Sequence, residues 1–198
     1  MKRTLIFLIL FIPVCSMGQR FTGGVLLGLN ASQIHGDTGG GYHKAGIAAG
    51  AFVKTEFREK WGGLLELRYS AKGSAIPSDD IWVKINLQYI EVPVMVTYDV
   101  FKKFQPQAGV SIGYLFRQTQ NYGSGYIIIP DEEGFNAYEV AGCLGIDYKV
   151  LDNLRINLRY SLSMIPVQQD FPGATSTRNL EASYNDVLTF AVYYQIGR

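Results

Sequence analysis

The segment RINLRYSLSM, Arg155–Met164, alternates without a break between polar and apolar side chains. Successive side chains of a β-strand point to opposite faces, so this segment would have one wholly polar face and one wholly apolar face. In a soluble sandwich the apolar face would turn toward the protein interior. In an outer-membrane barrel the same face would turn toward lipid. The alternation therefore predicts a strand and leaves two environments open for its apolar face.

The same alternation recurs along the rest of the chain, and apolar residues at helical spacing are hard to find. Ten residues of strand cover about 33 Å, which is enough to cross the hydrocarbon layer at a tilt near 45°. The predicted strands are residues 20–30, 44–57, 61–74, 85–100, 104–118, 135–150, 154–164 and 186–198.

Charge separates the two faces of these predicted strands. The strand at 85–100 keeps an uncharged apolar face only if its alternation slips once, so that Ile85, Leu87 and Tyr89 share a face with Ile90 and the apolar residues after it. A β-bulge near Tyr89–Ile90 would produce this slip, and Pro93, which cannot donate to a ladder, indicates irregularity nearby. The opposite faces carry Lys54, Glu56, Glu66, Arg68, Lys72, Glu91, Asp99, Arg117, Glu139, Asp147, Lys149, Arg155 and Arg159.

The connections between the predicted strands favour the membrane. Short joints at 58–60, 101–103 and 151–153 alternate strictly with long ones at 31–43, 75–84, 119–134 and 165–185, as in outer-membrane barrels. Aromatic residues also sort to two levels, as the two interfaces of a bilayer require. Near the short joints lie Phe21, Phe57, Trp61, Tyr98, Phe104, Tyr148 and Tyr194. Near the long ones lie Tyr69, Tyr89, Tyr114, Phe116, Tyr138 and Tyr160.

These patterns predict an all-β fold, an eight-stranded antiparallel up-and-down transmembrane β-barrel. A secreted sandwich or a lipocalin-like barrel is the alternative. Backbone groups in lipid cannot bond to water, so the sheet must close, and eight strands leave an interior that side chains nearly fill. We expect a paired charge network to plug this lumen, although a constitutive pore stays open as an alternative. Its predicted members are Glu66, Arg68, Glu91, Arg117, Glu139, Arg155 and Arg159.

The first residues predict export. Lys2 and Arg3 precede the apolar run 5–14, which is too short to span a bilayer as a helix, and small residues at Ser16 and Gly18 fit a cleavage site. We therefore expect a signal peptide at 1–18 and a barrel domain at 19–198, located in the outer membrane. Lipid attachment at Cys15 is an alternative. After cleavage only Cys143 would remain, so no internal disulfide is expected.

No catalytic, cofactor or metal site is predicted. His35, Asp37 and His43 could ligate a metal, but they surround a run of glycines and no fourth ligand is evident. A small lipid-active enzyme would need Ser70 or Ser74 to pair with one of these histidines, and no nucleophile motif supports that pairing. The formal net charge of +1 gives no reason to expect nucleic acid. The apolar run YIIIP at 126–130 could be a contact surface, or the flanking strands could extend through it as a hairpin.

Several stretches resemble the PorT-family outer-membrane β-barrels of the Bacteroidota. The stretches are GLN at 28–30, KAGIAAGAFV at 44–53, LELRYSAKGS at 65–74, LQYIEVPVMVTY at 87–98, GVSIGYL at 109–115 and RYSLSMI at 159–165. The resemblance covers most of the chain after the leader and implies an eight-stranded barrel like those of OmpA and OmpX. The family's named member is associated with type IX secretion and gliding. The resemblance implies no functional residue for this chain.

We therefore expect a monomeric, non-enzymatic outer-membrane protein with a structural or interaction role through its extracellular loops. Its expected partners are outer-membrane lipid and lipopolysaccharide, and an extracellular or secretion-machinery protein. The alternative function is an accessory component of type IX secretion or gliding, and a small lipid-active barrel enzyme is the third.

Overall fold

The computed structural model describes residues 20–35, 41–76, 83–101, 103–122, 125–127, 134–169 and 182–196. Strands dominate these residues, and among them we find no helix with the length and apolar character needed to span a membrane. The predicted signal peptide at 1–18 lies outside the described residues and stays a prediction. The strands are β1 (Arg20–His35), β2 (Lys44–Glu56), β3 (Trp61–Ile76), β4 (Val83–Tyr98), β5 (Phe104–Tyr122), β6 (Gly125–Ile127), β7 (Tyr138–Leu151), β8 (Leu154–Ser163), β9 (Gln168–Gln169) and β10 (Ala182–Ile196).

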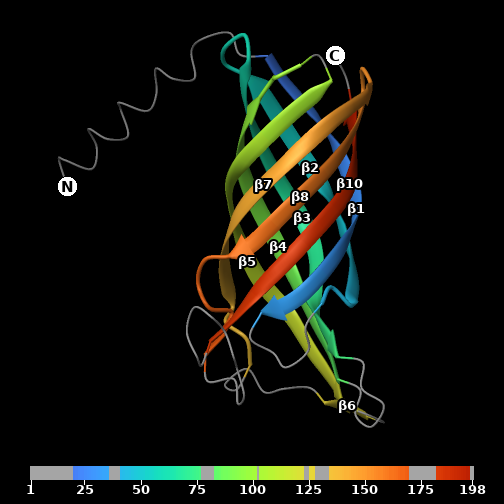
Figure 1. The fold of residues 1–198 in the computed structure, drawn as a ribbon, viewed down its shortest axis with the longest axis vertical. Helices are drawn as coiled ribbons and strands as arrows, with labels where there is room; N and C mark the ends of the chain where they lie inside the picture. The colour runs from blue at the N-terminus through green and yellow to red at the C-terminus, as the bar shows by residue number, and fades with distance from the viewer. Residues whose placement is uncertain are drawn as a thin grey trace, which may run out of the picture.

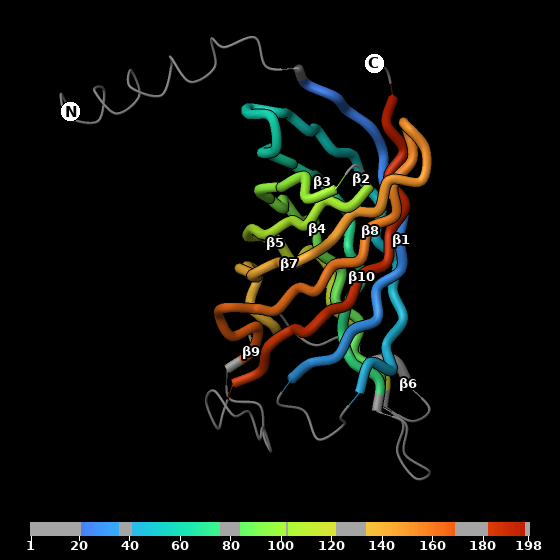
Figure 2. Tube along the Cα trace, turned by 45° about the horizontal axis from the view of Figure 1, so that its top comes forward, coloured from blue at the N-terminus to red at the C-terminus, as the bar shows by residue number. Residues whose placement is uncertain are grey.

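Eight of these strands close into an antiparallel barrel, which confirms the predicted fold class (Figure 1). Each long strand pairs with the next along the chain, and β1 closes the circle by pairing with β10, with Leu29 opposite Phe190. Figure 2 shows β1 and β10 running side by side along the wall. Closure gives each of these eight strands a paired neighbour on both sides, as backbone groups surrounded by lipid require.

The two ends of the barrel differ in their connections. Residues 57–60, 99–103 and 152–153 join strands at what we call the short-turn end, where β1 also begins and β10 ends (top of Figure 1). The opposite end, the long-loop end, carries the longer connections and the two short strands β6 and β9 (Figure 2). The predicted alternation of short and long connections is therefore confirmed. β6 pairs with the last residues of β5, with Ile127 opposite Gln120, so Tyr126 and Ile127 belong to a hairpin, and residues 128–130 of the predicted run lie outside the described residues.

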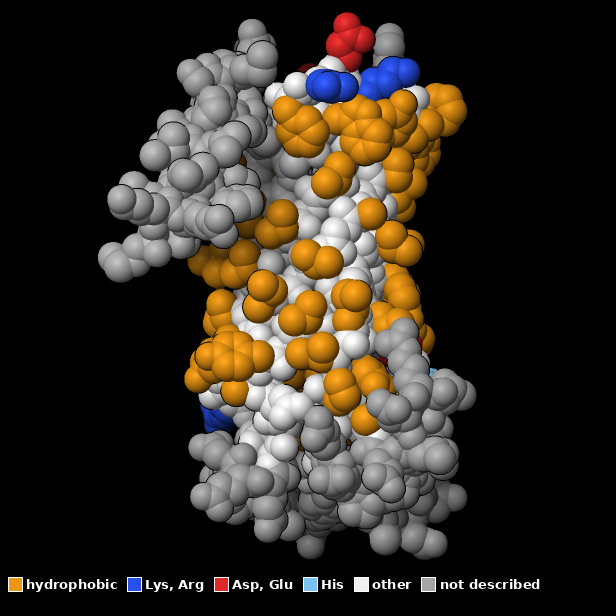
Figure 3. Space-filling model, turned by 90° about the vertical axis from the view of Figure 1, so that its left-hand side faces the viewer, with side chains coloured by type: hydrophobic (Ala, Val, Ile, Leu, Met, Phe, Trp, Pro, Cys, Tyr) orange, Lys and Arg blue, Asp and Glu red, His pale blue; other side chains and the backbone are white. Residues whose placement is uncertain are grey.

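Burial along β8 shows which face of the strand lines the interior. Arg159 is 0% exposed and Asn157 is buried with it, whereas Leu158 is 46% exposed. The polar face of the strand therefore lines the interior and the apolar face covers the outside. The same holds around the barrel, where apolar side chains form a broad band over the outer wall (Figure 3).

Aromatic residues flank this band at both levels. Trp61 packs on Tyr98 near the short-turn end, with ring centroids 4.7 Å apart, and Phe104 packs on Tyr148. Toward the long-loop end two further pairs form, Tyr69 with Phe116 and Tyr114 with Tyr138. Tyr89 was predicted to join this second level, which is wrong, because its side chain is fully buried inside the barrel.

The predicted slip in β4 is also wrong. Ile85, Leu87 and Tyr89 are buried on the same side as Glu91, so β4 alternates without a break. The bulge lies on the neighbouring strand. Gln88 pairs with Arg117 and Tyr89 with Leu115, so Phe116 is the extra residue, on β5. An extra residue reverses the facing of everything beyond it, so Arg117 turns outward.

Ile85 and Leu87 are buried because the two faces of the wall exchange polarity near the long-loop end. There Ile85 and Leu87 point inward, while the half-buried Lys84, Asn86 and Gln88 alternate with them on the outer face. Polar-out and apolar-in is the pattern of a barrel in water. The strands thus continue past the apolar band, which is why β1 and β5 run beyond their predicted ends and β10 begins before its own.

Candidate functional site

The lumen contains a network of ion pairs centred on Arg159 of β8. Its guanidinium donates to both carboxylate oxygens of Glu66 on β3, from Nη1 at 2.9 Å and from Nη2 at 2.6 Å. Tyr193 of β10 donates its hydroxyl to Glu66 Oε1 at 2.8 Å, and Gln107 Oε1 accepts from Arg159 Nη2 at 3.1 Å. Planar guanidinium and carboxylate groups match in this two-point geometry, which makes the pair strong and specific.

Further ion pairs extend the network toward the long-loop end. Arg68 lies 3.8 Å from Glu66 and donates from Nε to Glu91 Oε2 at 2.8 Å. Lys72 then bridges Glu91 and Glu139, with its ammonium 2.7 Å from Glu139 Oε2. The connected set therefore holds three cations and three anions, in the order Arg159, Glu66, Arg68, Glu91, Lys72 and Glu139.

Neutral groups complete the coordination of Glu139. Ser163 donates its hydroxyl to Glu139 Oε1, and Asn185 Nδ2 donates to the same oxygen at 3.2 Å. The Lys72 ammonium also stands 4.8 Å from the centre of the Tyr89 ring. All six charged members are nearly inaccessible to solvent. Burying an unpaired charge costs several kcal/mol, so these charged side chains can fill the lumen in place of water only because they pair with one another.

The structure places the predicted lumen residues in three settings. Glu66, Arg68, Glu91, Glu139 and Arg159 are brought together in the network. Arg155 is half-buried nearer the short-turn end, where it donates to Gln105 at 2.9 Å. Arg117 lies outside the lumen and is exposed, because the bulge at Phe116 reverses the facing of β5.

Sequence reasoning missed two central members, Lys72 and Tyr193. Alternation placed Lys72 on the charged face of its strand, but the predicted network did not include it. Tyr193 offered no such signal, because it follows the apolar Val192 and precedes another tyrosine. Only the closure of β10 against β1 and β8 brings its hydroxyl to Glu66.

Apolar side chains close the lumen on both sides of the network. Toward the short-turn end, Leu26, Phe52, Leu64 and Met95 form part of one buried cluster. Toward the long-loop end, a second buried cluster, the apolar cap, covers the network. The apolar cap consists of Ile34, Ile85, Leu87, Tyr89, Leu115, Phe135 and Val167. Phe135 and Val167 come from connections between strands, so the described parts of these connections, residues 134–137 and 164–167, fold inward over the barrel mouth.

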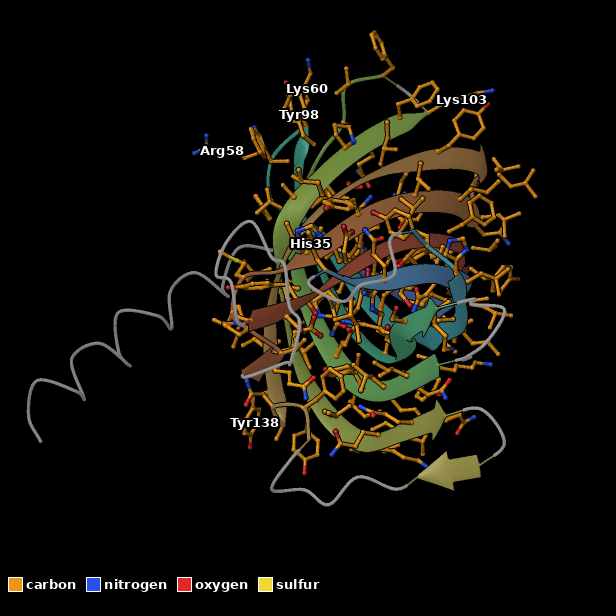
Figure 4. The ribbon with its side chains drawn as sticks, turned by 60° about the horizontal axis from the view of Figure 1, so that its bottom comes forward. His35, Arg58, Lys60, Tyr98, Lys103 and Tyr138 are labelled. Carbon is orange, nitrogen blue, oxygen red and sulfur yellow. The ribbon has the colours of Figure 1, made fainter. Side chains whose placement is uncertain are left out.

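A cavity of about 520 Å³ opens at the short-turn end. Charged side chains of both signs line it, and Figure 4 shows Arg58, Lys60 and Lys103 gathered at this end while Tyr138 lies at the other. Lys54 donates to Gln105 Oε1 at 2.8 Å, and Gln105 donates to Asp99 at 2.6 Å. We call this cavity the vestibule.

Gly41 and Tyr42, just before β2, are fixed to the β1–β10 seam on the outside of the barrel. Tyr42 donates its hydroxyl to Asp186 at 2.8 Å, and Gln33 donates to the other oxygen of the same carboxylate at 3.1 Å. Gln33 in turn accepts from the backbone of Gly41 at 2.9 Å. Burial, together with the Asp186 carboxylate, raises the pKa of Tyr42 well above its usual range.

The residues considered for metal or catalysis do not converge. Ser70 and Ser74 are buried in the barrel, whereas His35 and His43 are exposed. Asp37 lies outside the described residues. Within the described part of the chain, no group of three His, Cys, Asp or Glu side chains has a geometry suited to a metal ion.

Comparison with known proteins agrees with this architecture. The family model described as an outer membrane protein β-barrel domain matches residues 16–169. The chain belongs to this family. This outer membrane barrel is also similar to Neisserial surface protein A, with 12% identity, a TM-score of 0.54, and coverage of 91% of this chain and 100% of that one. It is similar to Ail of Yersinia pestis in complex with the heparin analogue sucrose octasulfate, with 11% identity, a TM-score of 0.50, and coverage of 89% and 99%. No curated protein sequence matches the outer membrane barrel significantly.

Proposed function

We propose that this protein is a closed, monomeric outer-membrane barrel that acts as a surface-anchored interaction protein through its long-loop end. The observation that carries the proposal is the filled lumen. A neutral ion-pair network and the apolar cap occupy the space that a pore would need. A barrel with no path through its centre serves by holding its ends in place on the two sides of the membrane.

The long-loop end supports the interaction role. The strands rise past the apolar band with a polar outer face, and the connections that contain Phe135 and Val167 pack onto the barrel mouth. This builds a folded platform above the membrane rather than a bare rim. Loops on a rigid scaffold are where binding residues concentrate. Export by a cleaved signal peptide at 1–18 is part of the same proposal.

Two measurements test this function. Planar bilayers that contain the purified protein should show no steady conductance under a sustained potential. Cells that display the protein should bind surface ligands that cells lacking it do not, and a chain with the connection between β8 and β10 shortened should lose that binding while remaining folded. Steady conductance would refute the closed scaffold. Binding that is unchanged by shortening would refute the role of the long-loop end.

An accessory role in type IX secretion or gliding is the second candidate, and the vestibule favours it. Phe101 at its rim is 71% exposed, beside charged residues of both signs, so the short-turn end also offers a surface for a protein partner. A photo-crosslinking residue at Phe101 should then capture a periplasmic protein in intact cells, and deletion of the gene should impair secretion. Capture only from Asn136, at the long-loop end, would favour the surface role instead.

A further inference from the structure

A second cavity, of about 440 Å³, lies on the wall of the barrel near the long-loop end. It occurs where the wall is incomplete. The ladder between β2 and β3 stops at Ala48 and Ser70, although β2 continues to Lys44 and β3 continues to Ile76. The side chains and backbone around this opening include Lys44, Ala71, Asn86, Gln88, Arg117 and Thr119. We call it the wall cavity.

The wall cavity crosses three strands in register. Ala71 on β3 pairs with Gln88 on β4, which pairs with Arg117 on β5. Asn86 pairs with Thr119 one step further along. The small Ala71 side chain leaves the space, and amide and hydroxyl groups form the sides. This outward placement of Arg117 depends on the bulge at Phe116.

The wall cavity carries uncompensated positive charge. Among the described residues, no Asp or Glu lines it and no carboxylate pairs with Lys44 or Arg117. The Lys44 ammonium donates to the backbone oxygen of Ala45 at 2.8 Å, and Lys84 adds a second positive charge nearby. Lys72 also lines the cavity, but its ammonium is paired with the carboxylates of Glu91 and Glu139. Lys44 is buried and Arg117 is exposed, and cations that no carboxylate neutralises favour an anionic ligand.

The position of the wall cavity along the barrel axis indicates that the anion belongs to a lipid headgroup. Arg117 directly follows Phe116, whose ring packs on Tyr69 with centroids 6.1 Å apart. Ala71 lies two residues beyond Tyr69, which is about 7 Å along a strand. Outward aromatic rings mark the interface between hydrocarbon and headgroups. The cavity therefore sits where lipid phosphates would lie.

We propose that the wall cavity binds the phosphorylated headgroup of an outer-leaflet glycolipid. Arg117 and Lys44 would hold the phosphate, because a guanidinium matches phosphate oxygens in a two-point geometry and an ammonium adds a point charge. The side chains of Asn86, Gln88 and Thr119 would form hydrogen bonds with sugar hydroxyls, both as donors and as acceptors. The inference rests on the proposed placement of the long-loop end outside the cell.

Native mass spectrometry of the full chain in non-ionic detergent, titrated with diphosphorylated lipid A, tests this site. The variants Arg117→Gln and Lys44→Gln should each bind about tenfold more weakly, the effect expected from losing one charged hydrogen bond. Arg58→Gln removes an exposed cation at the short-turn end and should bind as the parent does. Dephosphorylated lipid A should bind the parent as weakly as diphosphorylated lipid A binds the variants. Heat-modifiable gel mobility verifies that each variant is folded.

Three outcomes would overturn the site. One is unchanged affinity in folded Arg117→Gln and Lys44→Gln, and another is an equal loss in Arg58→Gln. The third is displacement of the lipid by inorganic phosphate or sucrose octasulfate at equal concentration, which would assign the cavity to soluble anions instead. The orientation of the barrel is decided separately by thiol labelling, so a wrong orientation and an absent lipid site give different results.

Discussion

Arg159 and Glu66 are 93 residues apart in the chain, yet they form a two-point salt bridge across the barrel, at 2.9 and 2.6 Å. Arg159 comes from β8 and Glu66 from β3, so the pair ties together strands that do not touch in the sheet. Both side chains are inaccessible to water, and their pairing offsets the cost of burying the two charges.

Breaking this pair should destabilise the barrel. Arg159→Gln leaves the Glu66 carboxylate in a dry interior, so we expect a loss of about 3–5 kcal/mol in the free energy of unfolding. Arg155→Gln is the matched control, because Arg155 is half-buried and hydrogen-bonded to the neutral Gln105. Urea titration of the protein refolded in lipid vesicles measures both. Equal losses in the two variants would show that the Arg159–Glu66 pair has no special role.

A charged substitution on the outer face should destabilise the barrel more strongly the closer it lies to the middle of the bilayer. Leu27 and Phe21 are both 64% exposed on β1, but Leu27 lies in the middle of the apolar band and Phe21 at its edge. Leu27→Arg should cost about 2–4 kcal/mol and Phe21→Arg about 0–1 kcal/mol, because charge is most costly at the midplane of the bilayer. The same refolding titration reports both values. Similar small costs would mean that this face meets water.

The apolar cap should contribute to stability as a core does. Leu87→Ala removes a fully buried side chain and should cost about 2–5 kcal/mol. Leu67→Ala, on the lipid-facing side of β3, leaves no internal cavity and should cost less. Chemical denaturation in the same vesicles compares them. If Leu87→Ala proved the milder of the two, Leu87 would face lipid and β4 would contain the slip after all.

Thiol labelling should report the orientation of the barrel. Cys143 is buried, so it should not react with an impermeant maleimide in the folded protein. Asn136→Cys places an exposed thiol at the long-loop end, and Asp152→Cys places one at the short-turn end. On intact cells the first should label and the second should not, while both should label after lysis. The reverse pattern on intact cells would invert the barrel.

The sequence by itself determined the barrel. Alternation along segments such as Arg155–Met164, together with the strict succession of short and long connections, specified eight antiparallel strands and the face that each turns to lipid. These signals are local, because the facing of a side chain depends only on its parity along the strand. Parity therefore identifies most of the charged lumen residues from the sequence alone, and Arg117 is the exception.

Only the tertiary structure decided where that pattern inverts. Ile85, Leu87 and Tyr89 are apolar, and the sequence alone could not tell whether lipid or the barrel interior receives them. The answer depends on where the strands leave the apolar band and on the extra residue at Phe116, which turns Arg117 outward. The partners in the ion-pair network likewise follow from closure. Alternation along the strands places Arg159, Glu66, Lys72 and Glu139 on the inner face. The stagger of the closed sheet then determines which cation pairs with which carboxylate.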